Sequence, residues 1–225
     1  MPSPLPEILR NLHHAAVAAG RPDPALLAVS KTQPAAAVAA LAAQGQRAFG
    51  ENYVQEALAK IAQLQALGLE WHLIGHLQSN KAEQVARHFQ WVQSVDRPKL
   101  VTALARARPG HLPPLQVLIQ VNIDDESSKH GCAPNEVDAL ATAVAAEPRL
   151  QLRGLMAIPA PWPDPARRRQ AFVRMRDLLQ PLSAAHPHAD TLSMGMSGDY
   201  AEAIAEGATM VRIGTALFGA RARPA

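Results

Sequence analysis

The segment AVSKTQP places a lysine, Lys31, directly after an apolar run and just before a proline-containing turn. Partial burial of a lysine disfavours its ammonium form, lowers its pKa and yields the free amine that attacks a carbonyl carbon. A lysine at the end of a strand can also pack its aliphatic stem while its charged head stays in water. Taken alone, the segment favours this second interpretation.

Two segments near the other end of the chain contain the residue types of a phosphate-binding site. In SMGMSGDY, Ser197, Gly198 and Asp199 lead into a predicted helix, and in RIGTALFG, Gly214 and Thr215 offer backbone N–H groups and a hydroxyl. Amides at a helix N-terminus bind phosphate readily. Each segment alone is equally explained by a helix cap or by tight packing, but their occurrence together favours a phosphate site.

An arginine lies inside the last apolar run of the chain. Arg212 stands between Val211 and Ile213, and a buried guanidinium requires a partner because it does not give up its proton. That partner is either an acid at the end of another strand, such as Glu51 or Asp96, or a ring nitrogen of a bound ligand.

A carbonyl-reactive amine, a phosphate site and a partner for an aromatic nitrogen are together what pyridoxal 5′-phosphate requires of a protein. The three features therefore predict this cofactor. An arginine, unlike an aspartate, would not keep the pyridine nitrogen protonated, so the ring would be a weak electron sink.

Eight apolar or β-branched runs, separated by helical patterns, must position these residues. The predicted strands are Leu26–Lys31, Ala48–Asn52, Glu70–His76, Trp91–Asp96, Leu115–Asn122, Leu152–Ile158, Thr191–Ser197 and Met210–Gly219. The predicted helices are Leu5–Ala19, Pro34–Gln44, Tyr53–Leu67, Asn80–His88, Pro98–Ala107, Pro134–Ala146, Pro165–Ala185 and Asp199–Glu206. Several of these helices begin with a proline, which is tolerated in the first turn.

This alternation over 225 residues predicts an α/β fold, a (β/α)₈ TIM barrel, as one domain spanning residues 1–225. A helix over residues 5–19 precedes a barrel over residues 26–219. The alternative is an open doubly wound sheet, which would carry a glycine-rich turn after its first strand, but Lys31–Pro34 contains no glycine. Closing the barrel brings the last strand beside the first, which places Lys31 near Arg212 at the end where barrel active sites form.

Composition argues against several classes of protein. The 22 Lys and Arg and the 19 Asp and Glu side chains are mixed along the chain, with no basic stripe interleaved with aromatic residues, so we expect no nucleic-acid partner. Cys132 is the only cysteine, which excludes an internal disulfide and a cysteine-rich zinc module. His186 and His188 lack an accompanying acid or thiol motif, so we expect no metal site.

The N-terminal segment lacks a charged region followed by an apolar core, so it does not read as a signal peptide. No window reaches the run of about 18 apolar residues that a membrane span requires. We therefore expect no membrane contact and a cytoplasmic location.

The chain resembles the YggS/PROSC family of pyridoxal phosphate homeostasis proteins through an ordered series of motifs that extends over nearly its whole length, from Leu26 to Gly219. These motifs are AVSKTQP, FGENYVQE, WHLIGHLQSNK, VNIDDESSKHG, LRGLMAIP, LSMGMSGDY and MVRIGTALFG. The resemblance implies a fold type III barrel similar to that of alanine racemase, without the C-terminal β domain of the racemase. One departure is His76, where the family motif usually has proline.

The resemblance also implies roles for single residues. Lys31 would bind pyridoxal 5′-phosphate as a Schiff base, and Arg212 would face the pyridine nitrogen. Asn52 and Met196 match family positions that approach the cofactor. The complete set expected to bind the cofactor is Lys31, Asn52, Met196, Ser197, Arg212, Gly214 and Thr215, of which Ser197, Gly214 and Thr215 would hold the phosphate.

The function implied by the family is pyridoxal phosphate homeostasis, in which the protein binds, stores or transfers the cofactor. We expect no catalytic residue and no substrate turnover, so the protein would not be an enzyme. Candidate recipients are apo-enzymes that depend on pyridoxal phosphate. With no obvious exposed apolar helix face, we expect a monomer or a weak dimer.

Two enzyme functions are the alternatives. An amino-acid racemase of this barrel type carries a second, β-rich domain that supplies a catalytic tyrosine, whereas this chain ends six residues after Gly219 and its two tyrosines, Tyr53 and Tyr200, each begin a predicted helix. A Schiff-base aldolase acting on a phosphorylated sugar would place its lysine on a later strand, with carboxylates nearby. Both alternatives thus lack residues that their chemistry requires.

Overall fold

Eight parallel strands close into a barrel in chain order, so the last strand pairs with the first. The computed structural model describes residues 4–125 and 130–219. The strands are β1 (Ala25–Val29), β2 (Ala48–Glu51), β3 (Glu70–Leu73), β4 (Trp91–Val95), β5 (Leu115–Gln120), β6 (Leu150–Met156), β7 (Thr191–Ser193) and β8 (Met210–Ile213). The predicted (β/α)₈ barrel is confirmed, and the open doubly wound sheet is excluded.

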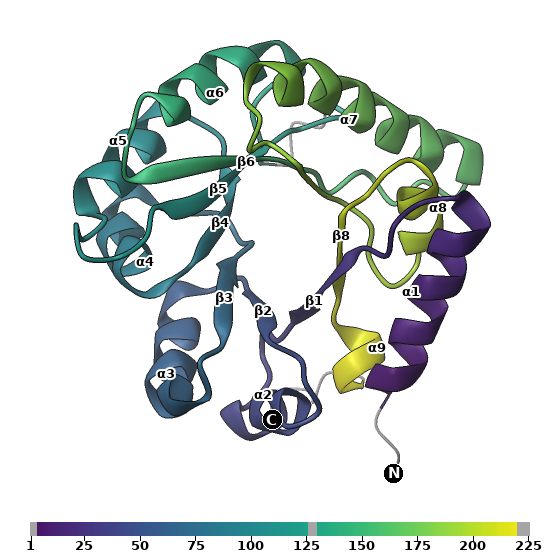
Figure 1. Ribbon diagram of the computed structural model, residues 1–225, viewed down its shortest axis with the longest axis horizontal. Helices are drawn as coiled ribbons and strands as arrows, with labels where there is room; N and C mark the ends of the chain where they lie inside the picture. The colour runs from purple at the N-terminus through teal and green to yellow at the C-terminus, as the bar shows by residue number, and fades with distance from the viewer. Residues whose placement is uncertain (1–3, 126–129, 220–225) are drawn as a thin grey trace.

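Helices surround the barrel as an outer layer (Figure 1). They are α1 (Leu5–Ala19), α2 (Ala35–Ala42), α3 (Val54–Leu64), α4 (Ala82–His88), α5 (Pro98–Ala107), α6 (Val137–Ala145), α7 (Pro165–Ala185), α8 (Tyr200–Ala205) and α9 (Thr215–Phe218), with short 3₁₀ turns η1 (Gln65–Leu67), η2 (Ser79–Lys81) and η3 (Pro134–Glu136). Proline opens α5 and α7 as predicted, and the Asp164 carboxylate caps α7 by accepting a hydrogen bond from the Ala166 N–H at 2.9 Å. None of the helices in the described ranges combines the length and the apolar character needed to cross a membrane.

The predicted strand Met210–Gly219 is wrong in its second half. β8 ends at Ile213, and the next turn of chain is α9, in which the N–H groups of Leu217 and Phe218 donate to the Gly214 carbonyl oxygen at 2.9 and 3.1 Å. A short apolar run can form either a strand or a buried helix, and its periodicity does not distinguish them. Here the apolar residues form the helix α9, which lies outside the ring of strands and against α1 (Figure 1).

Several other strands end earlier than predicted. Lys31, Asn52, His76 and Ser197 are expected at strand ends, but β1, β2, β3 and β7 stop one to four residues before them. These side chains therefore belong to the loops that follow the strands. They still lie at the carboxyl end of the barrel, as predicted, because these loops begin where the strands stop.

Side chains of the strands, together with Ile74 just after β3, fill the barrel interior in two apolar clusters. Leu27, Ile74 and Met210 form one of them, and Trp91, Leu118 and Met156 form the other. A larger core lies between the strands and the outer helices and includes the fully buried Phe49, Phe89 and Phe172. This double packing is typical of a barrel whose inside is solid, so space for a ligand is left only at its end.

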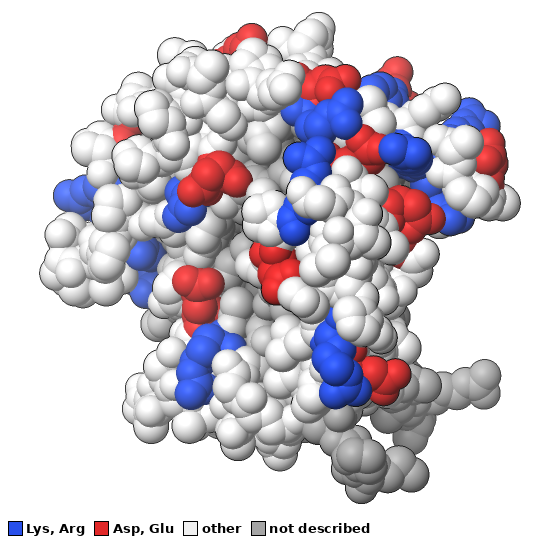
Figure 2. Space-filling view, turned by 45° about the vertical axis from the view of Figure 1, so that its right-hand side comes forward, with Lys and Arg blue, Asp and Glu red and all other residues white. Residues whose placement is uncertain are grey.

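Charges of both signs are interspersed on the face shown in Figure 2. The one basic run of the sequence, on α7, is partly neutralised by α8 and the residue after it: Arg168 contacts Glu202 at 2.9 Å, and Arg169 contacts Glu206 at 2.5 Å. A basic surface dedicated to nucleic acid is therefore not a feature of this face.

Candidate functional site

A pocket of about 300 Å³ lies at the carboxyl ends of the strands on the side of the barrel where β8 meets β1. Its lining includes every residue that the sequence predicts to bind a cofactor: Lys31, Asn52, Met196, Ser197, Arg212, Gly214 and Thr215. The remaining lining residues are Val29, Gln33, Ile74, Ile158, Gly198 and Gly219. The fold thus gathers polar groups from segments far apart in the chain around one small-molecule-sized space.

Lys31 is half-buried in the turn after β1. The next residue, Thr32, has a positive φ of 63°, which is rare for a β-branched residue and costs conformational energy. Its N–H donates to Glu56 Oε1 at 2.6 Å, and its hydroxyl donates to the Lys31 carbonyl oxygen at 2.6 Å. The turn that carries the amine is therefore held in one uncommon conformation by hydrogen bonds.

A buried lysine on α3 supports the same turn from behind. Lys60 Nζ donates to the Ser30 carbonyl oxygen at 2.7 Å, to Glu51 Oε1 at 2.7 Å and to Glu56 Oε1 at 2.6 Å. Lys60 is 4% exposed and Glu51 is fully buried. Burial raises the pKa of Glu51, although its hydrogen bonds with Lys60 and Ser30 oppose that shift. This network fixes α3 to the end of β1, directly beside Lys31.

Arg212 is buried at the floor of the pocket and is held by backbone and hydroxyl oxygens. Its Nη1 donates to the carbonyl oxygen and Oγ of Ser193 at 2.7 and 2.8 Å, and its Nη2 donates to the Ala157 carbonyl oxygen at 2.7 Å. Burial lowers the pKa of Arg212 to about 10, and the charge of Asp199 opposes that shift. The guanidinium thus stays protonated at neutral pH.

The suggested ion pair of Arg212 with Glu51 or Asp96 does not form. Glu51 contacts Lys60 and Asp96 contacts Arg97, and within the described ranges no salt bridge joins Arg212 to a carboxylate. The other interpretation, a guanidinium available to a ligand nitrogen, fits its place in the pocket lining.

A row of polar side chains, buried except for Glu70 at its far end, continues from Arg212 across the barrel interior. Ser193 Oγ donates to Gln93 Oε1 at 2.7 Å, Gln93 Nε2 lies 2.9 Å from His72 Nδ1, and His72 Nε2 lies 2.8 Å from Glu70 Oε1. If Gln93 donates to Nδ1, His72 is neutral with its proton on Nε2, and burial accordingly lowers the pKa of His72. The row fixes the Ser193 hydroxyl that Arg212 contacts.

The predicted phosphate segments lie side by side at the pocket. Gly214 and Thr215 lead into α9, and the first N–H groups of any helix have no partner within the helix. A Cβ atom on Gly214 would stand 3.3 Å from the Val29 carbonyl oxygen, so a larger residue would crowd the β1–β8 seam. Opposite it, Asp199 Oδ1 accepts a hydrogen bond from the Met196 N–H at 2.6 Å, which orders the loop carrying Ser197.

Asn52 presents a polar atom without a partner. Its Oδ1 is buried and accepts no hydrogen bond from any residue in the described part of the chain. A buried amide oxygen left unpaired costs about 1–3 kcal/mol, so such atoms are rare in folded proteins unless a ligand or water satisfies them. Its position in the pocket lining points to a ligand that donates a hydrogen bond there.

Comparison with known proteins decides the family. The family model for the N-terminal domain of alanine racemase matches residues 5–222. A pyridoxal phosphate homeostasis protein of Pseudomonas aeruginosa is 57% identical over 218 residues, covering 96% of this chain and 93% of that protein. The protein of the same name from Escherichia coli is 57% identical over 199 residues, covering 87% and 85%. The chain belongs to the pyridoxal phosphate homeostasis protein family.

Solved structures agree with this family assignment. The family member PipY of Synechococcus elongatus, solved with pyridoxal phosphate bound, is 39% identical with a TM-score of 0.80, covering 92% of this chain and 98% of PipY. Alanine racemase of Corynebacterium glutamicum is 21% identical with a TM-score of 0.69, covering 95% of this chain and 61% of the racemase. The racemase shares the fold of the homeostasis protein family, and its low identity supports nothing further.

Some residues at the carboxyl end of the barrel and in its buried polar row were not predicted from the sequence as parts of the site. The apolar wall formed by Ile74 and Ile158 was not assigned to the pocket, and neither was Gln33. Gln93 and Ser193 were not singled out, although a polar residue in the middle of an apolar strand is a signal that could have identified them.

Proposed function

We propose that this chain binds pyridoxal 5′-phosphate in the pocket beside the β1–β8 seam and serves in pyridoxal phosphate homeostasis, storing or transferring the cofactor without turning over a substrate. The whole chain would act as one cofactor-binding domain. The main support is that the Lys31 amine, the Arg212 guanidinium and the Gly214–Thr215 helix start line one pocket. Relatives at 57% identity are named for this homeostasis, and PipY was solved with the cofactor bound.

The residues of the pocket fit the cofactor chemically. When bound, pyridoxal 5′-phosphate supplies an aldehyde that condenses reversibly with a primary amine and releases water. Lys31 would provide that amine, and Ser197, Gly214 and Thr215 would donate hydrogen bonds to the phosphate. Asn52 would use its unpaired Oδ1 to accept a hydrogen bond from the ligand.

Arg212 would set the electronic state of the bound ring. A guanidinium is only a donor of hydrogen bonds, so a pyridine nitrogen facing it must act as acceptor and stays unprotonated. The neutral ring withdraws electrons weakly. The buried network from Ser193 to His72 would hold the guanidinium in this orientation.

Among the residues that the structure describes, the pocket lining also offers no second acid–base group beside Lys31. Within the described residues, the only titratable side chains of its lining are Lys31 and Arg212. Tyr53 is 60% exposed at the start of α3, and Tyr200 belongs to α8; neither lines the pocket. Racemisation requires two bases on opposite faces of the substrate carbon and aldol chemistry requires a carboxylate or similar group, so both alternatives lack support.

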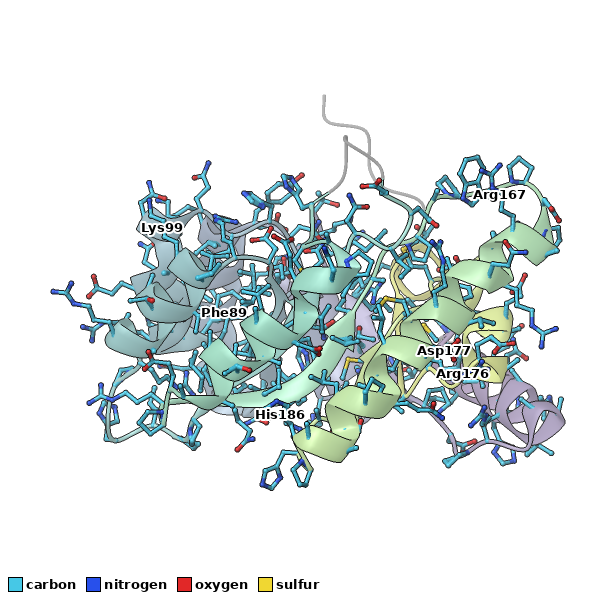
Figure 3. The ribbon with its side chains drawn as sticks, turned by 90° about the horizontal axis from the view of Figure 1, so that it is seen from above. Phe89, Lys99, Arg167, Arg176, Asp177 and His186 are labelled. Atoms are coloured by element: carbon cyan, nitrogen blue, oxygen red, sulfur yellow. The ribbon has the colours of Figure 1, made fainter. Side chains whose placement is uncertain are left out.

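The absorption spectrum of tag-free protein tests the proposal. We expect a visible band when pyridoxal 5′-phosphate is added, its loss in Lys31→Ala, and its retention in Lys99→Ala, a matched variant at an exposed lysine on the outside of α5 (Figure 3). An unchanged band in Lys31→Ala would overturn the assignment of the amine. Racemisation of alanine at an enzyme-like rate, lost in Lys31→Ala, would overturn the absence of turnover.

Transfer is tested separately by mixing the loaded protein with an apo-enzyme that requires pyridoxal phosphate. We expect the apo-enzyme to regain activity without excess free cofactor. Failure to reactivate it while the cofactor stays bound would limit the function to storage.

A further inference from the structure

Three side chains with metal-ligand chemistry meet at the same end of the barrel, next to the pocket but outside its lining. His76 follows β3, Asp96 follows β4, and His130 lies in the loop after β5, two residues before Cys132. Each offers one ligand atom, and these atoms all lie within 4.8 Å of one another. None of the three residues lines the cofactor pocket.

The carboxylate faces an imidazole across a gap that no direct hydrogen bond fills. His76 Nδ1 and Asp96 Oδ2 are 3.9 Å apart, beyond hydrogen-bond distance. The rings of His76 and His130 are stacked, with centroids 3.9 Å apart and planes at 18°. Because imidazole lone pairs lie in the ring planes, the two stacked rings must rotate before both can bind one cation together with Oδ2.

Neighbouring groups orient the carboxylate and fix the two loops. Arg97 Nη1 donates to Asp96 Oδ1 and Arg97 Nη2 donates to the Leu77 carbonyl oxygen at 2.9 Å, which leaves Oδ2 directed at His76. Ser94 Oγ donates to the Gly75 carbonyl oxygen at 2.7 Å, and Gln120 Nε2 donates to the His130 carbonyl oxygen at 3.0 Å. Metal ligands are commonly held in this way by a second set of hydrogen bonds from rigid elements.

The site is open to solvent, because His76 and His130 are exposed and Asp96 is partly buried. The His76 side chain is 34% exposed and the Asp96 side chain 10% exposed, so water has access to complete the coordination.

We propose that His76, Asp96 and His130 form a binding site for a divalent zinc-class ion, with water as the fourth ligand. Two imidazoles and one carboxylate are typical of such ions, whereas Mg²⁺ and Ca²⁺ prefer oxygen ligands throughout. Tetrahedral zinc with bonds of about 2.0–2.1 Å needs ligand atoms about 3.3 Å apart, which rotation of the two partly exposed histidine side chains can reach. These three residues form no ligand motif in the sequence, because only barrel closure brings their loops together.

The site is tested by titrating tag-free protein with Zn²⁺. Calorimetry measures the binding, and the melting temperature measures the stabilisation. We expect one Zn²⁺ per chain, and a rise in Tm of about 5–10 °C at a free Zn²⁺ concentration about 100 times Kd. His76→Asn and His130→Asn should each lose both effects, and His76→Pro, which installs the residue usual in the family motif, should do the same. Arg97→Gln, which removes only the support of Asp96, should weaken binding about 10–100-fold.

The double variant His186→Asn and His188→Asn is the matched control. Lys99 follows the proposed ligand Asp96 closely in the chain, and His186 lies far from Lys99, at the other edge of the molecule (Figure 3). The double variant should therefore bind Zn²⁺ like the original protein. Lys31→Ala should also keep the zinc site, which separates this proposal from the cofactor assignment. Wild-type protein that binds no stoichiometric Zn²⁺, or binding that His76→Asn and His130→Asn leave intact, would overturn the proposal.

Discussion

Leu27 and Arg212 are register partners at the seam where β1 and β8 close the barrel. β1 ends two residues later at Val29, and Lys31 stands in the turn that follows, so the amine and the guanidinium line one pocket although they come from opposite ends of the chain. Strand closure therefore brings together the amine and the guanidinium on which the proposed cofactor site depends.

Replacing Arg212 should change the electronic state of the bound cofactor. In Arg212→Glu a carboxyl group would face the pyridine nitrogen and share a proton with it, so the visible band should shift in position or intensity. Ser193→Ala is the matched control, because it removes one oxygen that the guanidinium contacts while the charge stays. Absorption spectra of both variants, with circular dichroism to verify folding, provide the check. An unchanged band in folded Arg212→Glu would mean that Arg212 is merely structural.

Gly75 should not tolerate a side chain. A Cβ atom there would stand 2.1 Å from the Asn52 carbonyl oxygen, so Gly75→Ala must push apart the loops after β2 and β3. Overpacking of this kind costs about 1–3 kcal/mol, and the displacement of Asn52 should also weaken cofactor binding. Gly110→Ala is the control, since its new Cβ would meet only Arg149 Nη2 at 3.7 Å. Urea unfolding and cofactor titration measure the two effects; equal stability of the two variants would contradict the packing argument.

Burial of His72 should make stability depend on pH. Burial lowers its pKa in the folded protein below the usual 6.5, so the unfolded chain binds more protons as the pH falls below 6.5. The unfolding free energy should then be highest above pH 6.5 and decline as the pH falls toward the folded pKa. His72→Gln should reduce this decline. Urea unfolding between pH 7.5 and about 5 gives the two slopes, and identical slopes would contradict a buried neutral imidazole.

Features that depend on the local pattern of apolar and polar residues could be predicted from the sequence. The order of strands and helices followed from alternating apolar runs, and the ends of strands mark the functional end of a barrel. Together with the family motifs, this was enough to select Lys31, Arg212 and the Gly214–Thr215 segment, all of which line the pocket.

Other features depend on which strands become neighbours across the barrel, and local pattern does not contain that information. The hydrogen bond between Ser193 and Gln93 joins β7 to β4 through the interior, and the three loops that carry His76, Asp96 and His130 meet only after closure. The strand prediction fails at α9 because Ala216, Leu217 and Phe218 form an apolar run compatible with either structure.

The site of covalent attachment tests the central claim most directly. Tag-free protein would be saturated with pyridoxal 5′-phosphate, reduced with borohydride, digested and analysed by mass spectrometry. The account predicts one pyridoxyl group per chain on Lys31, absent from Lys31→Ala and still present in Lys99→Ala. A pyridoxyl group on a different lysine, or no label after cofactor addition, would contradict it.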